Sequence, residues 1–280
     1  MLSLGLGLIA ALAWGFHDVS VRFVVGRTGV LRSFGAVLAA GLVLLLPFAA
    51  MGGLPSDPRA IGLSALGGLS YAGAGYALFR AFEIGPVRLV APVIGAFPVL
   101  SIAVAALQGQ SVSATQLLAV MAVVAGVGLC AALGDTEGAG HGDRRRAISW
   151  SLAAAVGFAA TFALGQAGAA AGLWGPVAAR VAALCVIGGA LAVTREPRPA
   201  NGGPFTWVLL ILMGAADALA MTLTYSAGRL PSPEFAAVAA SCFGVVTILL
   251  AWAFLKEAMR PSQWLAVGLV FAGIGTLAVA

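Results

Sequence analysis

The sequence predicts an all-α membrane protein whose ten transmembrane helices form two inverted-topology five-helix repeats. Three observations predict this class: an apolar composition, the chain length and a repeated segment. Of the 280 residues, 61% are hydrophobic and 9% are charged, whereas about a quarter of the residues in soluble domains are charged. A bilayer core takes about 20 helical residues, so the chain fills roughly ten spans and leaves no room for a soluble catalytic domain.

The composition also limits the partners. A net charge of +5 in a soluble protein suggests nucleic acid or another acidic partner. In a chain this apolar the main partner is the lipid bilayer, and we expect no nucleic-acid binding. Ordinary globular enzymes and DNA-binding proteins are excluded for the same reason.

The ten predicted spans are apolar runs separated by clusters of Gly, Pro and charged residues. In order along the chain, they cover residues 3–24, 32–52, 60–83, 86–108, 114–134, 148–169, 175–194, 205–228, 233–255 and 262–280.

The longest polar stretch lies almost at the midpoint of the chain and predicts the domain boundaries. The first five-helix repeat covers residues 1–134, a polar linker covers 135–147, and the second repeat covers 148–280. Three consecutive arginines, 144–146, lie in this linker. They fit a lipid-phosphate site, or a solvated loop whose charge fixes the topology.

A repeated segment relates the two halves. Residues 116–128 align with residues 263–275, and eight of the thirteen aligned positions are identical. Pro86, before the fourth span, likewise corresponds to Pro231, before the ninth. Because each half has an odd number of spans, the second half enters the membrane in the opposite orientation. Two such halves predict alternating access, in which a central site opens first to one side of the membrane and then to the other.

Three sets of residues resemble the motifs of a known family. They are Trp14-Gly15 with Arg22, residues 85–92 with 98–100, and residues 249–257 with Gln263. In their order, spacing and duplication they resemble the EamA-like branch of the drug/metabolite transporter superfamily, over essentially the whole chain. The resemblance implies a ten-helix carrier that moves small metabolites, often amino acids, outward.

Two positions depart from the pattern of that family. Lys256 stands where a Gly is usual before Glu257, and the segment 108–110 of the first half contains no Glu. The substrate within the family is not determined by these motifs.

Four residues of the first span are candidates for the transport site, because ionisable groups in hydrocarbon are costly unless paired or hydrated. Trp14, His17 and Asp18 share one side of the helix, and Arg22 lies one turn beyond Asp18. One interpretation is an Asp18–Arg22 ion pair that only neutralises two charges; the other makes both residues coupling or gating groups. His17 has no such partner nearby in the sequence. One interpretation is a neutral, hydrogen-bonded histidine; the other, which we favour, is a residue that contacts substrate or handles protons.

Asp217 is the sharpest candidate, because it lies at the centre of the eighth span, far from the headgroups. Its charge must be paired, solvated by a cavity or removed by protonation. Alignment of the repeats places it beside the position of Tyr71, which is central in the third span. We expect Asp217 to hold a substrate ammonium, with aromatic contacts from Tyr71 and Trp14. The alternative is a structural pair with a helix end or with Arg22.

Two further residues are predicted to bind substrate. Tyr225 lies at the edge of the Asp217 face, and Gln166 offers an uncharged polar group on the sixth span.

Four residues are predicted to act in gating. Arg80 and Glu83 are one turn apart near the end of the third span, on the opposite side from Tyr71, and form a gate or an interfacial pair. Pro92 and Pro98 interrupt backbone hydrogen bonds in the fourth span and allow a bend.

The sequence contains no set of residues for catalysis or metal binding. Its histidines are His17 and His141, its three cysteines have unrelated spacings, and no phosphate-binding loop occurs. We therefore expect neither an enzyme nor a bound cofactor.

The function that accounts for a duplicated, inverted half with a central Asp is a secondary carrier in the bacterial inner membrane. We expect it to export small metabolites, preferably amino acids, and the sequence leaves open whether protons are also carried. The alternatives are an efflux carrier for drugs or other cations, an uptake carrier of the same fold, and a membrane receptor or scaffold.

Two arguments about orientation conflict. Ten Lys and Arg residues lie near the odd-numbered connections, and three lie near the even-numbered ones: Arg59, Arg180 and Arg229. The positive-inside rule then places both termini outside, whereas the family resemblance implies both termini inside.

Overall fold

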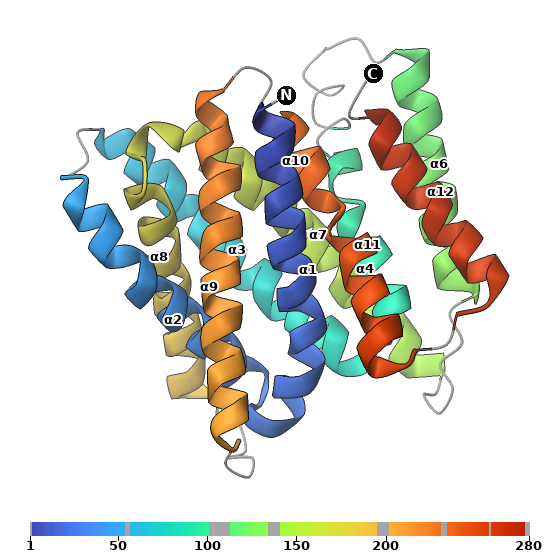
Figure 1. The fold of residues 1–280 in the computed structure, drawn as a ribbon, viewed down its shortest axis with the longest axis horizontal. Coiled ribbons are helices and arrows are strands. Elements are labelled where there is room, and N and C mark those ends of the chain that lie inside the picture. The colour runs from blue at the N-terminus through green and yellow to red at the C-terminus, as the bar shows by residue number, and fades with distance from the viewer. Residues whose placement is uncertain are drawn as a thin grey trace.

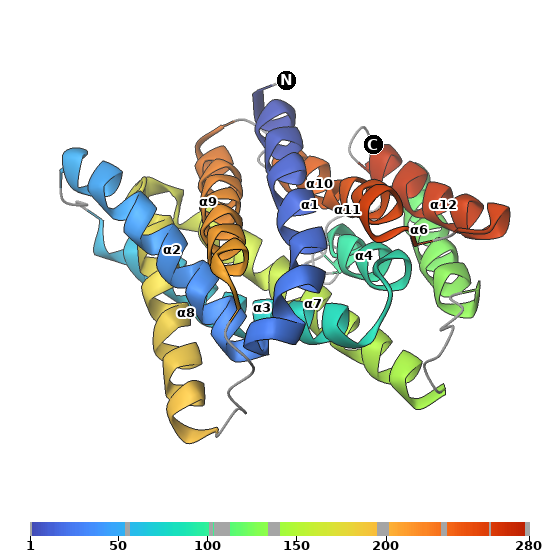
Figure 2. The ribbon, with the colours of Figure 1, turned by 60° about the horizontal axis from the view of Figure 1, so that its bottom comes forward.

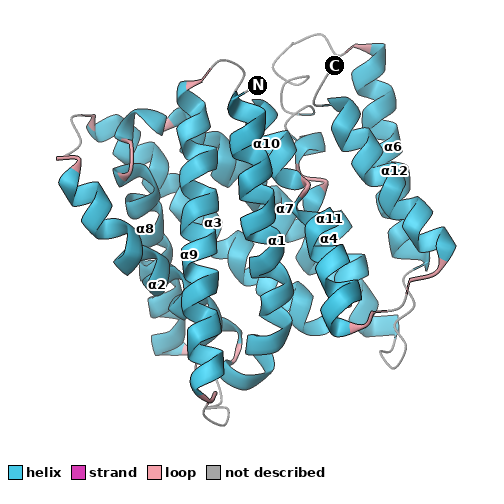
Figure 3. Cartoon of the chain, viewed as in Figure 1, coloured by secondary structure: helices cyan, strands magenta, loops and turns pink. Residues whose placement is uncertain are grey.

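A computed structural model describes residues 2–53, 57–100, 103, 113–133, 141–194, 202–230, 234–257 and 259–277. Within these residues all regular secondary structure is helical, and no strand occurs (Figure 3). Six of the described helices are long and apolar enough to cross a membrane, and three shorter apolar helices accompany them. The chain is therefore an all-helical, multi-pass membrane protein.

The helices of the first half overlap the predicted spans in order. They are α1 (Leu2–Thr28), α2 (Val30–Met51), α3 (Pro58–Ile84), α4 (Val87–Gly95) and α6 (Ala114–Leu133). Most of the fourth predicted span beyond Leu100 lies outside the described residues, as does the segment 108–110.

The helices of the second half follow the same order. They are α7 (His141–Ala167), α8 (Trp174–Val193), α9 (Pro204–Ser226), α10 (Glu234–Ser241), α11 (Phe243–Leu250) and α12 (Pro261–Leu277), with short turns η1 (Ala169–Ala171), η2 (Ala227–Arg229) and the π-helical turn η3 (Ala251–Leu255). The ninth predicted span thus consists of α10, α11 and η3.

α7 begins earlier than the sequence predicts. Residues 141–147, expected in the polar linker, form its first turns, so the three arginines 144–146 lie on a helix. Asp143 in the first turn carries a negative charge, which the helix dipole favours at that end.

The two halves run in opposite directions. Figure 1 shows both chain ends at the same end of the molecule, where α1 begins, whereas α7 begins at the opposite end. Figure 2 shows α6 and α12 side by side at one edge, beyond α4 and α11.

The repeated segments of the two halves pack against each other in α6 and α12. A Cβ on Gly126 would lie 2.7 Å from Val270 Cγ2, and a Cβ on Gly273 would lie 2.7 Å from Val123 Cγ2. In the alignment of the two repeats, Gly126 corresponds to Gly273 and Val123 corresponds to Val270. The contact is therefore nearly two-fold symmetric, and glycine lets the two backbones approach closely.

The fourth and ninth spans are both broken near their centres. α4 ends at Gly95, and helical geometry resumes at Pro98, whose ring nitrogen has no N–H to bond to the carbonyl of the preceding turn. The sequence prediction of an interruption here is met at Pro98, whereas Pro92 lies inside α4. α10 and α11 are separated at Cys242 without any proline.

Candidate functional site

Asp217 lies at the centre of a buried polar cluster that joins four helices. Arg180 Nη2 in α8 donates to Asp217 Oδ2 over 2.6 Å. Trp14 Nε1 in α1 and Tyr71 Oη in α3 both donate to Asp217 Oδ1, over 3.1 and 2.7 Å. Both carboxylate oxygens therefore have partners, as a charge buried away from water requires.

Arg180 is the member of this cluster that the sequence analysis missed. It was counted with the arginines near loops, but it lies inside α8 and is fully buried, with 0% of its surface exposed. Arg180 therefore does not belong in the charge count that sets the orientation. The available signal was its position within the predicted span 175–194, where every ionisable residue is a candidate for function.

Gly41 makes room for the Arg180 side chain, and Gly214 lies opposite it on α9. A Cβ on Gly41 in α2 would lie 2.8 Å from Arg180 Nε and 2.8 Å from the carbonyl oxygen of Gly214 in α9. Only residues without a side chain let α2 and α9 approach this closely beside the guanidinium.

A second polar pair lies one turn along α1 from Trp14. His17 Nδ1 and Asp18 Oδ1 are 2.8 Å apart, and both side chains are buried. The predicted interpretation in which Asp18 pairs with Arg22 is wrong, because Arg22 Nη1 instead donates to the carbonyl oxygens of Phe82 and Gly85. The end of α3 offers the arginine free carbonyl oxygens, which a helix terminus leaves without partners.

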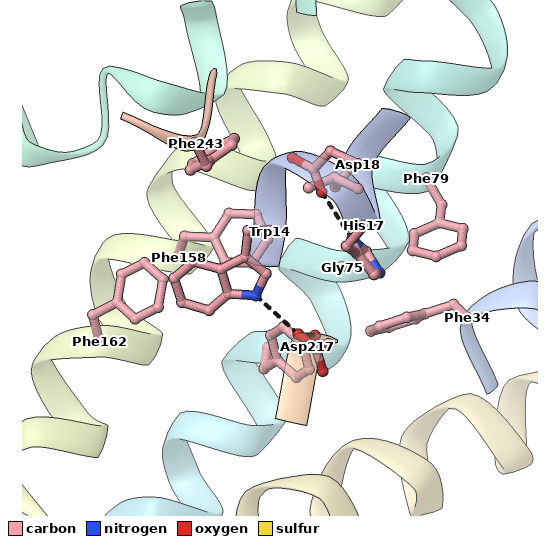
Figure 4. Close-up of a pocket in the computed structure, with 12 residues that line it drawn as sticks. Trp14, His17, Asp18, Phe34, Gly75, Phe79, Phe158, Phe162, Asp217 and Phe243 are labelled. Atoms are coloured by element: carbon pink, nitrogen blue, oxygen red, sulfur yellow. Dashed lines mark hydrogen bonds and ion pairs between the residues drawn. The ribbon is translucent and has the colours of Figure 1, made fainter. Parts of the chain in front are cut away.

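The two polar groups border a single pocket, shown in Figure 4. Its polar residues are Trp14, His17, Asp18, Tyr71 and Asp217, and its other lining residues are Phe34, Gly75, Leu78, Phe79, Phe158, Phe162 and Phe243. Figure 4 shows the His17–Asp18 pair at one side of the pocket and the Trp14–Asp217 contact at the other. The lining helices come from both halves: α1, α2 and α3 from the first, and α7, α9 and α11 from the second.

Aromatic rings form most of the pocket wall. The ring of Trp14 packs against Phe162 with 5.3 Å between centroids. Phe34 contacts Phe79 at 5.2 Å and meets Tyr71 edge-on at 5.6 Å. Such a wall suits an apolar body or a cation over a ring face.

The structure brings together four of the six predicted substrate-binding residues, Trp14, His17, Tyr71 and Asp217, and places the other two outside the pocket lining. Tyr225 is buried two turns along α9 from Asp217, with its ring against Gly165 of α7. Gln166 Nε2 lies 3.5 Å from the carbonyl oxygen of Thr224. These residues join α7 to α9 beside the pocket.

The predicted gating residues lie at other places in the fold. Arg80 and Glu83 form a half-exposed ion pair on α3, outside the pocket lining. Pro98 marks the break after α4, and Pro92 lies in α4 itself.

The motif around Glu257 forms a contact between the halves. Both oxygens of the Glu257 carboxylate accept from the first turn of α4, with Val87 N at 3.1 Å and Arg88 N at 3.3 Å. The preceding residue, Lys256, has a φ of 56° and a ψ of 29°, a left-handed conformation that favours glycine. A glycine, which the resemblance leads one to expect at this position, would adopt this conformation without strain.

Within the described ranges, no three His, Cys, Asp or Glu residues are grouped so that they fit a metal ion. The pocket lining combines Asp217, whose carboxylate is paired with Arg180 behind it, with a histidine–carboxylate pair and an aromatic wall.

Comparison with known proteins gives two findings. A family model described as the EamA-like transporter family matches residues 1–132 and 145–279. A solved structure titled only "Crystal structure of protein" has the same fold, with a TM-score of 0.72 and 15% sequence identity, and the match covers 99% of this chain and 97% of that one. No curated protein matches the chain.

Proposed function

The chain belongs to the EamA-like transporter family, and from this premise we propose that it exports small metabolites, amino acids first among them, across the bacterial inner membrane. Members of this family are membrane transporters. The observation that carries the proposal is the pocket itself, which is lined by polar and aromatic side chains from both halves of the chain. Binding sites of secondary transporters lie at such repeat interfaces near the centre of the bilayer.

We also propose that transport proceeds by alternating access. The two halves are similar and oppositely oriented, so rocking one against the other would exchange the closed and open ends of the pocket. The contact of Glu257 with the start of α4 and that of Arg22 with the end of α3 are made at the same end of the molecule. In this mechanism both contacts hold that end closed and break when it opens.

Counterflow in proteoliposomes tests the function. Vesicles loaded with the twenty amino acids should take up a radiolabelled subset in a saturable way, while protein-free vesicles should not. Phe162→Ala removes a ring from the pocket wall and should reduce the exchange. Phe205→Ala removes an exposed ring from the outside of α9 and should leave the exchange unchanged. A folded wild-type protein that exchanges none of the amino acids would contradict the proposed substrate class.

A second candidate is efflux of organic cations. It is favoured by the aromatic wall and by a buried carboxylate oxygen of Asp18 that has no partner within the described structure. The same vesicles, loaded with an organic cation such as tetraphenylphosphonium in place of the amino acids, distinguish the two candidates.

A further inference from the structure

Two buried polar atoms of the pocket have no hydrogen-bond partner among the described residues. They are Asp18 Oδ2 and His17 Nε2. Asp18 is 2% exposed and His17 is 4% exposed, and both line the pocket. A buried polar atom without a partner is costly, so each of these two atoms needs a partner that the described residues do not supply.

The hydrogen-bond donors of the pocket, by contrast, are already used by Asp217. The indole N–H of Trp14 and the hydroxyl of Tyr71 both point to Asp217 Oδ1. Arg180 Nη2 donates to Asp217 Oδ2, and its Nη1 lies 3.1 Å from the sulfur of Met221. Arg180 Nε has no hydrogen-bond partner among the described residues, but Arg180 is not among the residues that line the pocket.

The balance of charge around Asp18 points the same way. Arg180 and Asp217 neutralise each other. Arg22, the charged residue one turn further along α1, is turned to the carbonyl oxygens of Phe82 and Gly85. Asp18 is therefore the carboxylate of the pocket lining that has no arginine or lysine partner among the described residues.

The His17 ring adds an acceptor to this site. Where Asp18 is ionised, its carboxylate has no hydrogen to give, and His17 Nδ1 is then the donor in the contact with Asp18 Oδ1. In a neutral imidazole the other nitrogen, Nε2, is then an acceptor. The unused groups of the pocket are thus two acceptors within an aromatic wall, which is the surrounding that an organic ammonium prefers.

We propose that Asp18 Oδ2 is the subsite for the ammonium group of the transported molecule, and that the pocket holds no matching subsite for a carboxylate. Asp217, the carboxylate that the sequence favoured for this role, instead anchors α1, α3, α8 and α9 to one another. The substrate class is then a small primary amine with an apolar body, and an amino acid binds through its ammonium alone. This inference rests on the proposed transport function, since it assigns a role to the same pocket.

Three compounds that share one ring test the inference: phenethylamine, phenylalanine and 3-phenylpropionate. Their affinities for the purified full-length protein are measured by calorimetry in detergent. Phenethylamine should bind at least as tightly as phenylalanine, and 3-phenylpropionate should not bind. Asp18→Asn keeps the shape of the side chain, removes its charge and should weaken phenethylamine binding at least tenfold. The matched control Asp143→Asn changes an exposed acid at the start of α7 and should leave the affinity unchanged.

A measurement on the wild-type protein covers the case in which Asp18→Asn does not fold. Carbodiimide labels accessible carboxyl groups, and peptide mass spectrometry locates the label. Phenethylamine should slow the labelling of Asp18, and 3-phenylpropionate should not.

Several results would overturn the ammonium subsite. They are an absence of phenethylamine binding to the wild type, equal binding to Asp18→Asn, unprotected Asp18 labelling, and tight binding of 3-phenylpropionate. Counterflow of the three compounds is scored separately, so that a failure to transport contradicts the proposed function while the binding data still decide the subsite.

Discussion

Arg180 in α8 and Asp217 in α9 form a fully buried ion pair, with 2.6 Å between Nη2 and Oδ2. Because Trp14 and Tyr71 also donate to Asp217, the pair joins helices from both halves. Such a pair is weak evidence for stability as a whole, but removing one partner leaves an uncompensated charge in a low-dielectric surrounding.

We therefore expect Asp217→Asn to destabilise the protein by about 3–5 kcal/mol, because it leaves the charge of Arg180 unpaired. Thermal unfolding in detergent measures the effect. The half-exposed Arg80–Glu83 pair supplies the matched control, since Glu83→Gln should cost less than about 1 kcal/mol. The double variant Arg180→Gln/Asp217→Asn should recover part of the lost stability, and an additive loss would contradict the pairing.

Lys256→Gly should stabilise the protein by about 1 kcal/mol, because a lysine in the left-handed region is strained and glycine is not. The midpoint of thermal unfolding should rise accordingly. Lys256→Ala keeps the Cβ that causes the strain, and it should give little or no gain. Equal gains from both substitutions would show that the lysine charge, and not its backbone conformation, is unfavourable.

Glu257→Ala should expose the first turn of α4 to exchange, because the amides of Val87 and Arg88 lose their acceptor. Loss of a capping carboxylate costs about 0.5–2 kcal/mol. Hydrogen exchange followed by mass spectrometry should show faster exchange in peptides that cover residues 87–90. Peptides from the start of α3, whose cap is Asp57, serve as the internal reference and should be unaffected.

Gly126→Ala and Gly273→Ala should each destabilise the contact between α6 and α12 by about 1–3 kcal/mol, the usual cost of overpacking. The two effects should be similar, because the environments of the two glycines are equivalent. Gly128→Ala is the matched control, since a Cβ there meets nothing within 4 Å. The loss of stability is measured by comparing the midpoints of thermal unfolding of the three variants in detergent with that of the wild type. A loss of stability in Gly128→Ala equal to that in Gly126→Ala would contradict the packing explanation, because alanine is the better helix former and has room at position 128.

The sequence predicted those features of the protein that follow directly from the type of a residue and its position in the chain. The apolar runs predict the helices because a bilayer core admits few other structures, and the order of the described helices follows that prediction. The aligned segments 116–128 and 263–275 predict two related halves, and the family model matches both. Asp217 was singled out because a carboxylate at mid-span requires a partner or a cavity, and the structure gives it three hydrogen-bond donors.

The partners of the charges were beyond the reach of the sequence. Asp18 and Arg22 are one turn apart and of opposite charge, yet they do not pair, because the end of α3 presents carbonyl oxygens to Arg22. The charge count from the sequence assigned Arg180 to a loop. Its partner Asp217 lies 37 positions later in the chain, on another helix. The spacing of residues along one helix shows which ion pairs can form within that helix. It does not show which polar groups of other helices compete for the same charges.

The sequence by itself therefore determined the class of protein, its helices and its duplication, because each of these follows from the local cost of placing a residue in hydrocarbon or from identity between segments. Only the tertiary structure decided that both carboxylate oxygens of Asp217 have hydrogen-bond partners, whereas Asp18 Oδ2 has none among the described residues. That distinction between Asp217 and Asp18 depends on distances between α1, α3, α8 and α9, and the packing of helices distant in the sequence sets those distances.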